Sequence, residues 1–357
     1  MIRTLFFWGI LLSTGTVLGQ NLPVSQLPES KKAVIEEFTA FRCGNCPLGH
    51  EETNNIMESL GEENVLVIGY HVGSLANPVD AGDPDFRTPD GNVMQAHFNV
   101  SGTPSGPVNR STFGGSSYPL SANEWSPNSS SIVNDTADAN VAMDVSINHN
   151  TREVTINTEV FYTTNSNETH FLTIGYMEEG IIGPQTSYNS TWNSDYFYPN
   201  GDYYHRHVFR GFVNSAEGDS IDATSSGTIS NNYTFSVPAE INGAPVNIYS
   251  LEFFAIVHEG LNGPTDSEVI NAAKTVDAFV SLPEQESREL IISPNPNNGF
   301  FHIKGLELND VVTITDLSGR VVSFERNGKA IEVSQAGYYL VMVRGEAGVG
   351  TSRLVVE

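Results

Sequence analysis

The only two cysteines of this 357-residue chain, Cys43 and Cys46, are three residues apart in the stretch FRCGNCPLGH. Cysteines with this spacing can form and break a disulfide, because backbone amides at a helix start stabilise a thiolate and the second sulfur lies one turn on. Arg42 places a cation beside the first sulfur. A structural clip is the alternative, although closing so short a loop stabilises a fold by only about 2 kcal/mol. The residues leave redox use and a structural bond both open.

The segments around the cysteines predict a strand, a helix and a second strand. Residues 33–41 form an apolar run typical of a strand, and Pro47 opens a helix that Gly61 ends. Residues 65–72 (VLVIGYHV) are almost continuously apolar, as in a strand covered on both faces. A C-x-x-C pair beside such a βαβ unit resembles a thioredoxin-like redox motif.

This resemblance assigns roles to two further residues. Glu37, six residues before Cys43, occupies the place where thioredoxin-like proteins keep a buried carboxylate that moves a proton to the resolving cysteine. The resemblance also implies a cis-proline opposite the pair, and Thr103-Pro104 is the natural candidate. Cys43 would then be the nucleophile, Cys46 the resolving cysteine, and Pro104 would shape the substrate groove. His50 and His71 are candidates for neighbours of the pair, which their spacing alone does not establish.

The N-terminus and the charge indicate an exported protein. Residues 1–19 have the features of a signal peptide, with Arg3, a short apolar core and small residues before Gln20, and no later run is long enough to span a membrane. Export places the cysteines in an oxidising compartment, so a Cys43–Cys46 disulfide is expected. With 17 Lys+Arg against 42 Asp+Glu, the net charge of −25 argues against nucleic-acid and anionic-membrane partners. No motif calls for a cofactor.

We expect a multidomain α/β plus all-β protein. Its parts are a thioredoxin-like domain at 31–137, an antiparallel β-sandwich at 138–282, a linker at 283–291 and a small β-sandwich at 292–357. Alternating apolar residues in VAMDVSIN and EVTINTEVFY, joined by the turn HNTR, predict a hairpin in the second part. Short strands separated by turn residues fill the last part.

Longer motifs resemble two known families. EEFTAFRCGNCPLGHE, GTPSGPVNR, and GIIGPQ with YYHRHVFR are similar to the outer membrane protein 28 family of Bacteroidetes, over about residues 31–278. That resemblance implies a thioredoxin-like domain joined to a β-rich domain at the outer membrane or cell surface. Arg42 departs from the aromatic residue that many relatives carry before the first cysteine, which puts a shared partner preference in doubt.

The C-terminal region resembles the type A sorting domain of type IX secretion. The motifs ISPNPNNGFFHIKG, VTITDLSGRVV, GYYLVMVRG and SRLVVE follow in the expected order. This implies a folded address tag that the secretion machinery reads and usually removes. An appended immunoglobulin-like module is the alternative.

Other polar and aromatic groups are weaker candidates for functional sites. Asp80, Asp83, Asp85 and Asp90 could hold Ca²⁺, but their spacing is not that of an EF-hand, and a solvated loop is preferred. His205 and His207 would share one face of a strand, yet no third metal ligand is evident, so no metal site is assigned.

Residues 188–212 are rich in aromatic side chains, and Trp192, Tyr198 and Tyr204 are candidates for contacts with a glycan or peptide. A loop packed by its own rings is the preferred alternative. Two functions remain open. One is thiol–disulfide exchange on extracytoplasmic thiol proteins. The other is a surface binding protein or adhesin with a structural disulfide.

Overall fold

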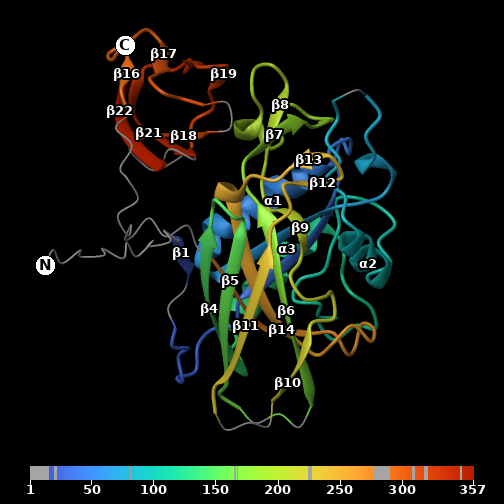
Figure 1. Ribbon diagram of the computed structural model, residues 1–357. Helices are drawn as coiled ribbons and strands as arrows, with labels where there is room; N and C mark the ends of the chain where they lie inside the picture. The colour runs from blue at the N-terminus through green and yellow to red at the C-terminus, as the bar shows by residue number, and fades with distance from the viewer. Residues whose placement is uncertain are drawn as a thin grey trace, which may run out of the picture.

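The structure is a computed structural model that describes residues 16–19, 22–80, 82–164, 166, 168–223, 227–275, 290–307, 310–316, 321–345 and 348–357. It is β-rich, with three α-helices among the described residues, and ends in a separate β domain (Figure 1). The main sheet contains seven strands in the order β15-β14-β6-β9-β3-β2, with β10 paired to β6. A four-stranded sheet, β1-β4-β5-β11, packs against part of it.

The cysteines lie in a β2–α1–β3 unit. β2 (Ala33–Thr39) and β3 (Val65–His71) pair in parallel, as expected for two strands joined by a helix, and every residue of both is buried. α1 (Cys46–Leu60) has Pro47 in its first turn and ends at Gly61, whose φ of 89° suits glycine. Because β2 alternates, Glu36 and Glu37 point to opposite faces of the sheet.

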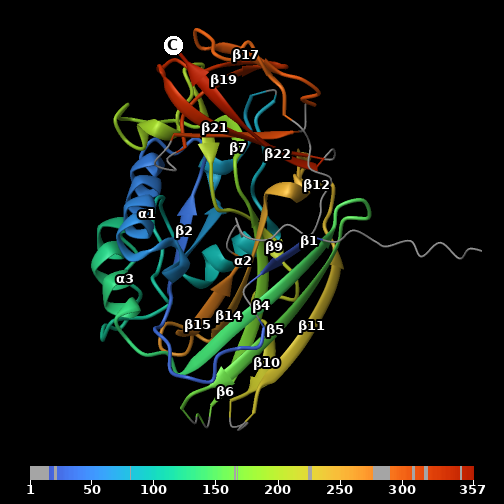
Figure 2. The same ribbon diagram turned by 90° about the vertical axis from the view of Figure 1, so that its left-hand side faces the viewer.

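Both faces of this parallel pair are covered. α1 and α3 (Trp125–Val133) pack on one face, and Figure 2 shows the two helices side by side there. The other face packs against α2 (Pro89–His97), Tyr118 and side chains of β6, β9 and β14. The Thr103–Pro104 peptide bond is cis, and residues 105–108 then run antiparallel to β2 through bridges at Phe38 and Ile35.

A second core lies between two antiparallel layers. β4 (Ala139–Asn148) and β5 (Glu153–Tyr162) form the predicted hairpin, and β11 (Ile229–Ser236) extends it. Their inward residues pack against β6 (Thr169–Glu178), β14 (Leu251–His258) and β15 (Val269–Lys274) of the main sheet. β1 (Thr16–Gly19), at the end of the expected signal peptide, pairs with β4, while residues 1–15 of that segment lie outside the described residues.

Short strands connect and flank these layers. β9 (Val208–Phe212) joins β6 to β3 in the main sheet, and β7 pairs with β8 as a separate hairpin. The remaining strands of this part are β7 (Ile181–Pro184), β8 (Asp202–His205), β10 (Asp219–Asp222), β12 (Glu240–Ile241) and β13 (Ala244–Pro245).

The C-terminal domain has its own core, formed by two small sheets of order β16-β17-β20-β19 and β18-β21-β22. Their bounds are β16 (Ile292–Ser293), β17 (Phe300–Ile303), β18 (Val311–Asp316), β19 (Glu325–Asn327), β20 (Ala330–Glu332), β21 (Gly337–Gly345) and β22 (Gly348–Val356). Of the expected linker, 283–291, residues 283–289 lie outside the described residues.

Three features differ from the sequence-based expectation. The main sheet draws strands from both sides of residue 138, so the first two parts share one sheet instead of forming two separate ones. Helix α3 was not predicted, because its sequence WSPNSSSIV is rich in serine and has no clear apolar period. The helix after the cysteines begins at Cys46, and Cys43 lies in the turn before it.

Among the described residues, no helix combines the length and apolarity that a membrane crossing requires.

Candidate functional site

Cys43 and Cys46 form a disulfide at the start of α1. The turn between them is closed by a hydrogen bond from the Cys46 N–H to the Cys43 carbonyl at 3.2 Å. Both cysteines are buried, at 2% and 0% exposure, and pack against Ala40 and Ala76. The Sγ atom of Cys43 lies 3.5 Å from the Thr103 carbonyl oxygen. The structure therefore brings the cysteine pair and the Thr103-Pro104 segment, 60 residues apart, into direct contact.

Glu37 and Pro104 meet beneath α1, one turn after Cys46. A Cβ atom placed on Gly49 would lie 2.7 Å from the Pro104 Cβ and 2.8 Å from the Glu37 Oε1, so only glycine fits there. Glu37 is 2% exposed, and burial raises the pKa of its carboxyl group to about 8. Such a group holds a proton at neutral pH and can give it to a base that forms nearby.

A chain of polar contacts runs from Glu37 into the β-rich part of the protein. The His50 Nε2 lies 2.9 Å from the Thr39 Oγ1 and 3.6 Å from the Glu37 Oε1. On the other side of the ring, the His50 Nδ1 contacts the Tyr203 hydroxyl at 2.9 Å, and that hydroxyl accepts a hydrogen bond from Asn193 at 2.6 Å. Burial, together with His205 and His207, lowers the pKa of His50 to about 3, so its imidazole is neutral.

These groups line a small cavity, which we call the inner cavity. Glu37, His50, Tyr203 and His207 contribute to its wall, and its volume is about 20 Å³. That is room for about one water molecule, which needs roughly 10–15 Å³ when measured this way. A water there would have several polar partners, as buried waters require.

Backbone from the β-rich part covers the disulfide turn. The N–H of Thr186 donates to the Phe41 carbonyl and the N–H of Tyr188 donates to the Gly44 carbonyl, both at 2.8 Å. The Tyr188 ring lies over Gly44, where an added Cβ would overlap it. Residues 185–188, the cover segment, thus pair with the cysteine-bearing turn.

Gln185 strengthens this cover. Its side-chain amide donates to the Cys43 carbonyl at 3.1 Å and lies 3.5 Å from the Ala40 carbonyl. Gln185 is itself buried, so these bonds are shielded from water. No sequence pattern indicates this contact, although Gln185 ends the GIIGPQ motif.

Arg42 lies next to the disulfide in sequence, but its guanidinium is directed elsewhere. Its Nη1 lies 3.5 Å from the Asn77 carbonyl oxygen, and its backbone N–H donates to Leu75 at 3.3 Å. The structure thus places Arg42 where it holds the 74–77 turn against the cysteine turn.

The aromatic segment packs largely on itself. Tyr203 contacts Phe197 with ring centroids 4.7 Å apart, and Tyr196 lies 6.2 Å from Tyr204. Tyr198 instead meets Phe324 of the C-terminal domain, 6.1 Å away. Trp192, Tyr198 and Tyr204 are all partly buried, and the packing matches the preferred expectation of a loop held by its own rings.

The remaining polar candidates do not converge. Strand β8 ends at His205, and His207 has a left-handed φ of 55°, so the two histidines do not share a face. The His205 Nε2 contacts the Pro184 carbonyl at 3.2 Å, whereas the His207 Nδ1 contacts Glu179 at 2.7 Å.

The aspartates of the 80–90 loop are engaged separately. Asp83 accepts backbone N–H groups of its own loop, Asp85 pairs with Arg87 at 2.6 Å, and Asp90 accepts the Phe212 N–H at 3.1 Å. Asp83, Asp85 and Asp90 therefore each have a partner of their own.

Comparison with known families decides the identity. The profile described as outer membrane protein Omp28 matches residues 92–271, just over half of the chain. The chain belongs to the Omp28 family. A second profile, the secretion system C-terminal sorting domain, matches residues 292–357. This Omp28-family protein is therefore exported to the outer membrane or cell surface with a type IX sorting tail. The family match begins after Cys43 and Cys46, so it does not assign them a role.

Solved structures support the architecture. The structure titled HBP35 of Porphyromonas gingivalis is 18% identical, with a TM-score of 0.51 over 92% of this chain and 99% of that one. At this identity the likeness concerns the fold alone. A transglutaminase from red sea bream, 11% identical, matches 88% of this chain and 45% of its own with a TM-score of 0.22, too low to carry an argument. No curated protein matches this chain.

Proposed function

We propose that this protein carries out thiol–disulfide exchange on extracytoplasmic proteins, through Cys43 and Cys46 on a thioredoxin-like N-terminal domain. Residues 31–137 would form that domain and 138–282 the β-rich domain, followed by the linker 283–291 and the sorting domain 292–357. The observation that carries the proposal is the contact between the disulfide at the start of α1 and the cis Thr103–Pro104 segment. The parallel β2–α1–β3 unit and the antiparallel segment after Pro104 support it.

The exchange would follow two balanced steps. A substrate thiolate attacks the Cys43 Sγ, forms a mixed disulfide and breaks the Cys43–Cys46 bond, so that Cys46 leaves as a thiolate. A second substrate thiolate then attacks the substrate sulfur of the mixed disulfide, and Cys43 leaves as a thiolate. The substrate loses two electrons and gains a disulfide, while the protein gains two thiols. A low-molecular-weight disulfide outside the cytoplasm would reoxidise the pair.

Glu37 would act as the proton donor in the first step. Its carboxyl group is protonated at neutral pH because burial raises its pKa to about 8, and it lies beneath Gly49, one turn from Cys46. Transfer of this proton neutralises the leaving Cys46 thiolate and leaves the negative charge on the Glu37 carboxylate, which lines the inner cavity. Water in the inner cavity, together with His50 and Tyr203, would connect Glu37 to the rest of the polar chain.

A second function is favoured by one specific observation. The cover segment and the 2% exposure of Cys43 keep the disulfide from approaching thiols. A covered disulfide suits a surface binding protein or adhesin in which the bond only holds the cysteine turn. Trp192, Tyr198 and Tyr204 would then be the first residues to test for a ligand.

Insulin reduction with dithiothreitol, together with refolding of scrambled ribonuclease, separates the two functions. The wild-type protein should accelerate both reactions, and Cys43→Ser should abolish the acceleration. Tryptophan fluorescence checks that the variant folds, because one of the contributing rings, Trp125, is fully buried beside the β2–α1–β3 unit. Equal behaviour of wild type and variant would retire the exchange function.

The reduction potential gives an independent test. Structural disulfides lie below about −300 mV, whereas exchange catalysts lie above this value. Equilibration with glutathione buffers should therefore place the Cys43–Cys46 couple above about −300 mV if the pair turns over. A lower value would assign the bond a structural role.

A further inference from the structure

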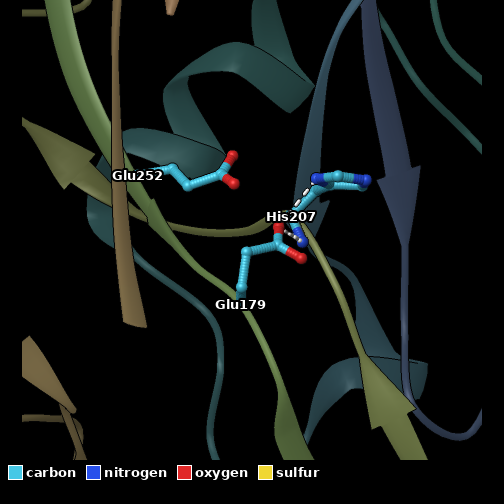
Figure 3. Close-up of side chains that lie close together, drawn as sticks. All are labelled: Glu179, His207 and Glu252. Atoms are coloured by element: carbon cyan, nitrogen blue, oxygen red, sulfur yellow. Dashed lines mark hydrogen bonds and ion pairs between the residues drawn. The ribbon is translucent and has the colours of Figure 1, made fainter. Parts of the chain in front are cut away.

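Three ionisable side chains from neighbouring strands of the main sheet converge, and one of them, His207, also lines the inner cavity. Glu179 follows β6, His207 precedes β9, and Glu252 lies on β14. One oxygen of each carboxylate and one ring nitrogen of His207 all lie within 4.8 Å of one another. Figure 3 shows the two carboxylates turned toward the near side of the imidazole ring.

His207 is held firmly in this cluster. Its Nδ1 lies 2.7 Å from the Glu179 Oε1, and its backbone N–H donates to the same oxygen at 2.5 Å. The residue is 5% exposed, yet within the described part of the chain neither ring nitrogen makes a hydrogen bond of acceptable geometry. A buried imidazole without an aligned hydrogen bond is unusual, because buried polar groups are almost always satisfied.

We propose that Glu179, His207 and Glu252 bind a divalent transition-metal ion, with Zn²⁺ as the best match. One imidazole and two carboxylates form a donor set that zinc accepts, leaving a fourth position for water. Ca²⁺ and Mg²⁺ fit less well, because they prefer oxygen ligands in greater number. The site is distinct from the cysteine pair and from the His205–His207 pairing considered in the sequence.

The geometry requires only small movements. With zinc–ligand bonds of about 2.0–2.2 Å, tetrahedral ligands are about 3.4 Å apart. The contact between the His207 Nδ1 and Glu179, at 2.7 Å, would open by about 0.7 Å, and the wider pairs, within 4.8 Å, would close by at most about 1.4 Å. Glu179 and Glu252 also line a cavity of about 100 Å³, which gives water access to the fourth position.

The charges are also suitable for a cation. The cluster offers two carboxylates, whose negative charge attracts a cation, beside one imidazole nitrogen. Arg206 contacts the Glu179 Oε2 at 3.1 Å and would orient this carboxylate from behind, as groups around metal ligands commonly do.

The competing interpretation is an ion-pair network without a metal, running from Arg206 through Glu179 to His207. Both interpretations place Glu179 in the same position, so stability alone does not distinguish them. Zinc binding and its loss in Glu252→Gln do distinguish them, because the ion-pair network calls for no zinc ion and only the metal site uses Glu252 as a ligand.

The test is calorimetric titration of the full-length, untagged protein with ZnCl₂. Non-reducing conditions keep Cys43 and Cys46 as a disulfide, so that no thiolate competes for zinc. Glu252→Gln and His207→Asn remove ligands, and Asn tolerates the left-handed φ of 55° at position 207. Glu62→Gln is the matched control, because Glu62 also faces Arg206, at 3.6 Å, but lies outside the cluster.

We expect one equivalent of Zn²⁺ on the wild type and on Glu62→Gln, and affinity lower by at least about 100-fold on the two ligand variants. Co²⁺ in place of Zn²⁺ should give visible absorption bands typical of four-coordinate geometry. If the wild type binds Zn²⁺ no more tightly than Glu252→Gln does, the proposal is overturned. It is also overturned if Glu62→Gln loses as much zinc affinity as the two ligand variants. Either result would mean that the negative surface, with its net charge of −25, attracts the ion without a site.

Discussion

Replacing Glu37 by glutamine should change how the stability of the protein depends on pH. In the folded protein, burial raises the pKa of this carboxyl group from 4.5 to about 8. Between these two pH values the folded state holds a proton that the unfolded state has lost. The stability contributed by the neutral carboxyl group is therefore fully present below about pH 4.5 and is lost as the pH rises to about 8.

The size of the effect follows from the same shift. Each pH unit in this window costs about 1.4 kcal/mol, so the whole shift corresponds to about 5 kcal/mol of unfolding free energy. Glutamine has nearly the same shape as neutral glutamic acid and does not ionise. The free energies of unfolding of variant and wild type should therefore be similar near pH 5. At pH 8.5 that of the variant should be higher by about 4 kcal/mol.

Urea unfolding of the oxidised proteins at several pH values measures this difference. Tryptophan fluorescence follows unfolding, because Trp125, at the start of α3, is fully buried against the β2–α1–β3 unit. Glu58→Gln is the control, since Glu58 is an exposed carboxylate on α1 of the same β2–α1–β3 unit. The m-value must stay constant for midpoints to be converted into free energies.

Two results would refute the reasoning. A stability difference between Glu37→Gln and wild type that does not change with pH would mean that Glu37 titrates normally and is hydrated. If the unfolding free energy of Glu37→Gln falls relative to that of the wild type as the pH rises, the ionised carboxylate is the form that the folded protein favours. Either result would also remove the proton donor from the proposed exchange mechanism.

Three further predictions concern the cover segment, the turn after Pro104 and the C-terminal domain. Gln185→Ala removes a buried hydrogen bond to Cys43 (3.1 Å), worth about 1 kcal/mol, and should speed disulfide reduction by dithiothreitol several-fold. Ser187→Ala, whose hydroxyl bonds Asn189 within the loop, should leave that rate unchanged. Gly106→Ala places a Cβ against the Glu36 carbonyl oxygen and should lower the unfolding free energy by about 1–3 kcal/mol, whereas Gly102→Ala, facing open space, should have little effect in the same urea titration. Deletion of residues 292–357 should leave the protein in the periplasm of a host with type IX secretion, and surface labelling equal to that of the full chain would contradict the sorting role.

Much of the local structure was predictable from the sequence. The apolar runs before and after the cysteines correspond to β2 and β3, and Pro47 and Gly61 correctly mark the two ends of α1. Alternating apolar residues gave the β4–β5 hairpin with the correct face inward. The motifs of the last 66 residues, from 292 to 357, identified the sorting domain that the family profile confirms. These features depend on residues that are close in sequence, where periodicity and turn chemistry are decisive.

The pairing of strands was not predictable. β9 and β3 are joined in one sheet by a bridge between Val208 and Gly69, far apart in sequence. No local pattern encodes such a partner, because a buried strand is apolar whichever neighbour it pairs with. For this reason the first two parts of the chain were expected as separate domains, although they share a sheet.

The sequence by itself determined the composition of the candidate site: two cysteines, a glutamate before them and a proline downstream. Only the tertiary structure decided that Gln185 and Tyr188 close over the cysteine turn and that His50 reaches Tyr203. It also brought Glu179, His207 and Glu252 together. The physical reason is that burial and contact depend on how distant segments pack, and packing sets the pKa of Glu37 and the access to Cys43.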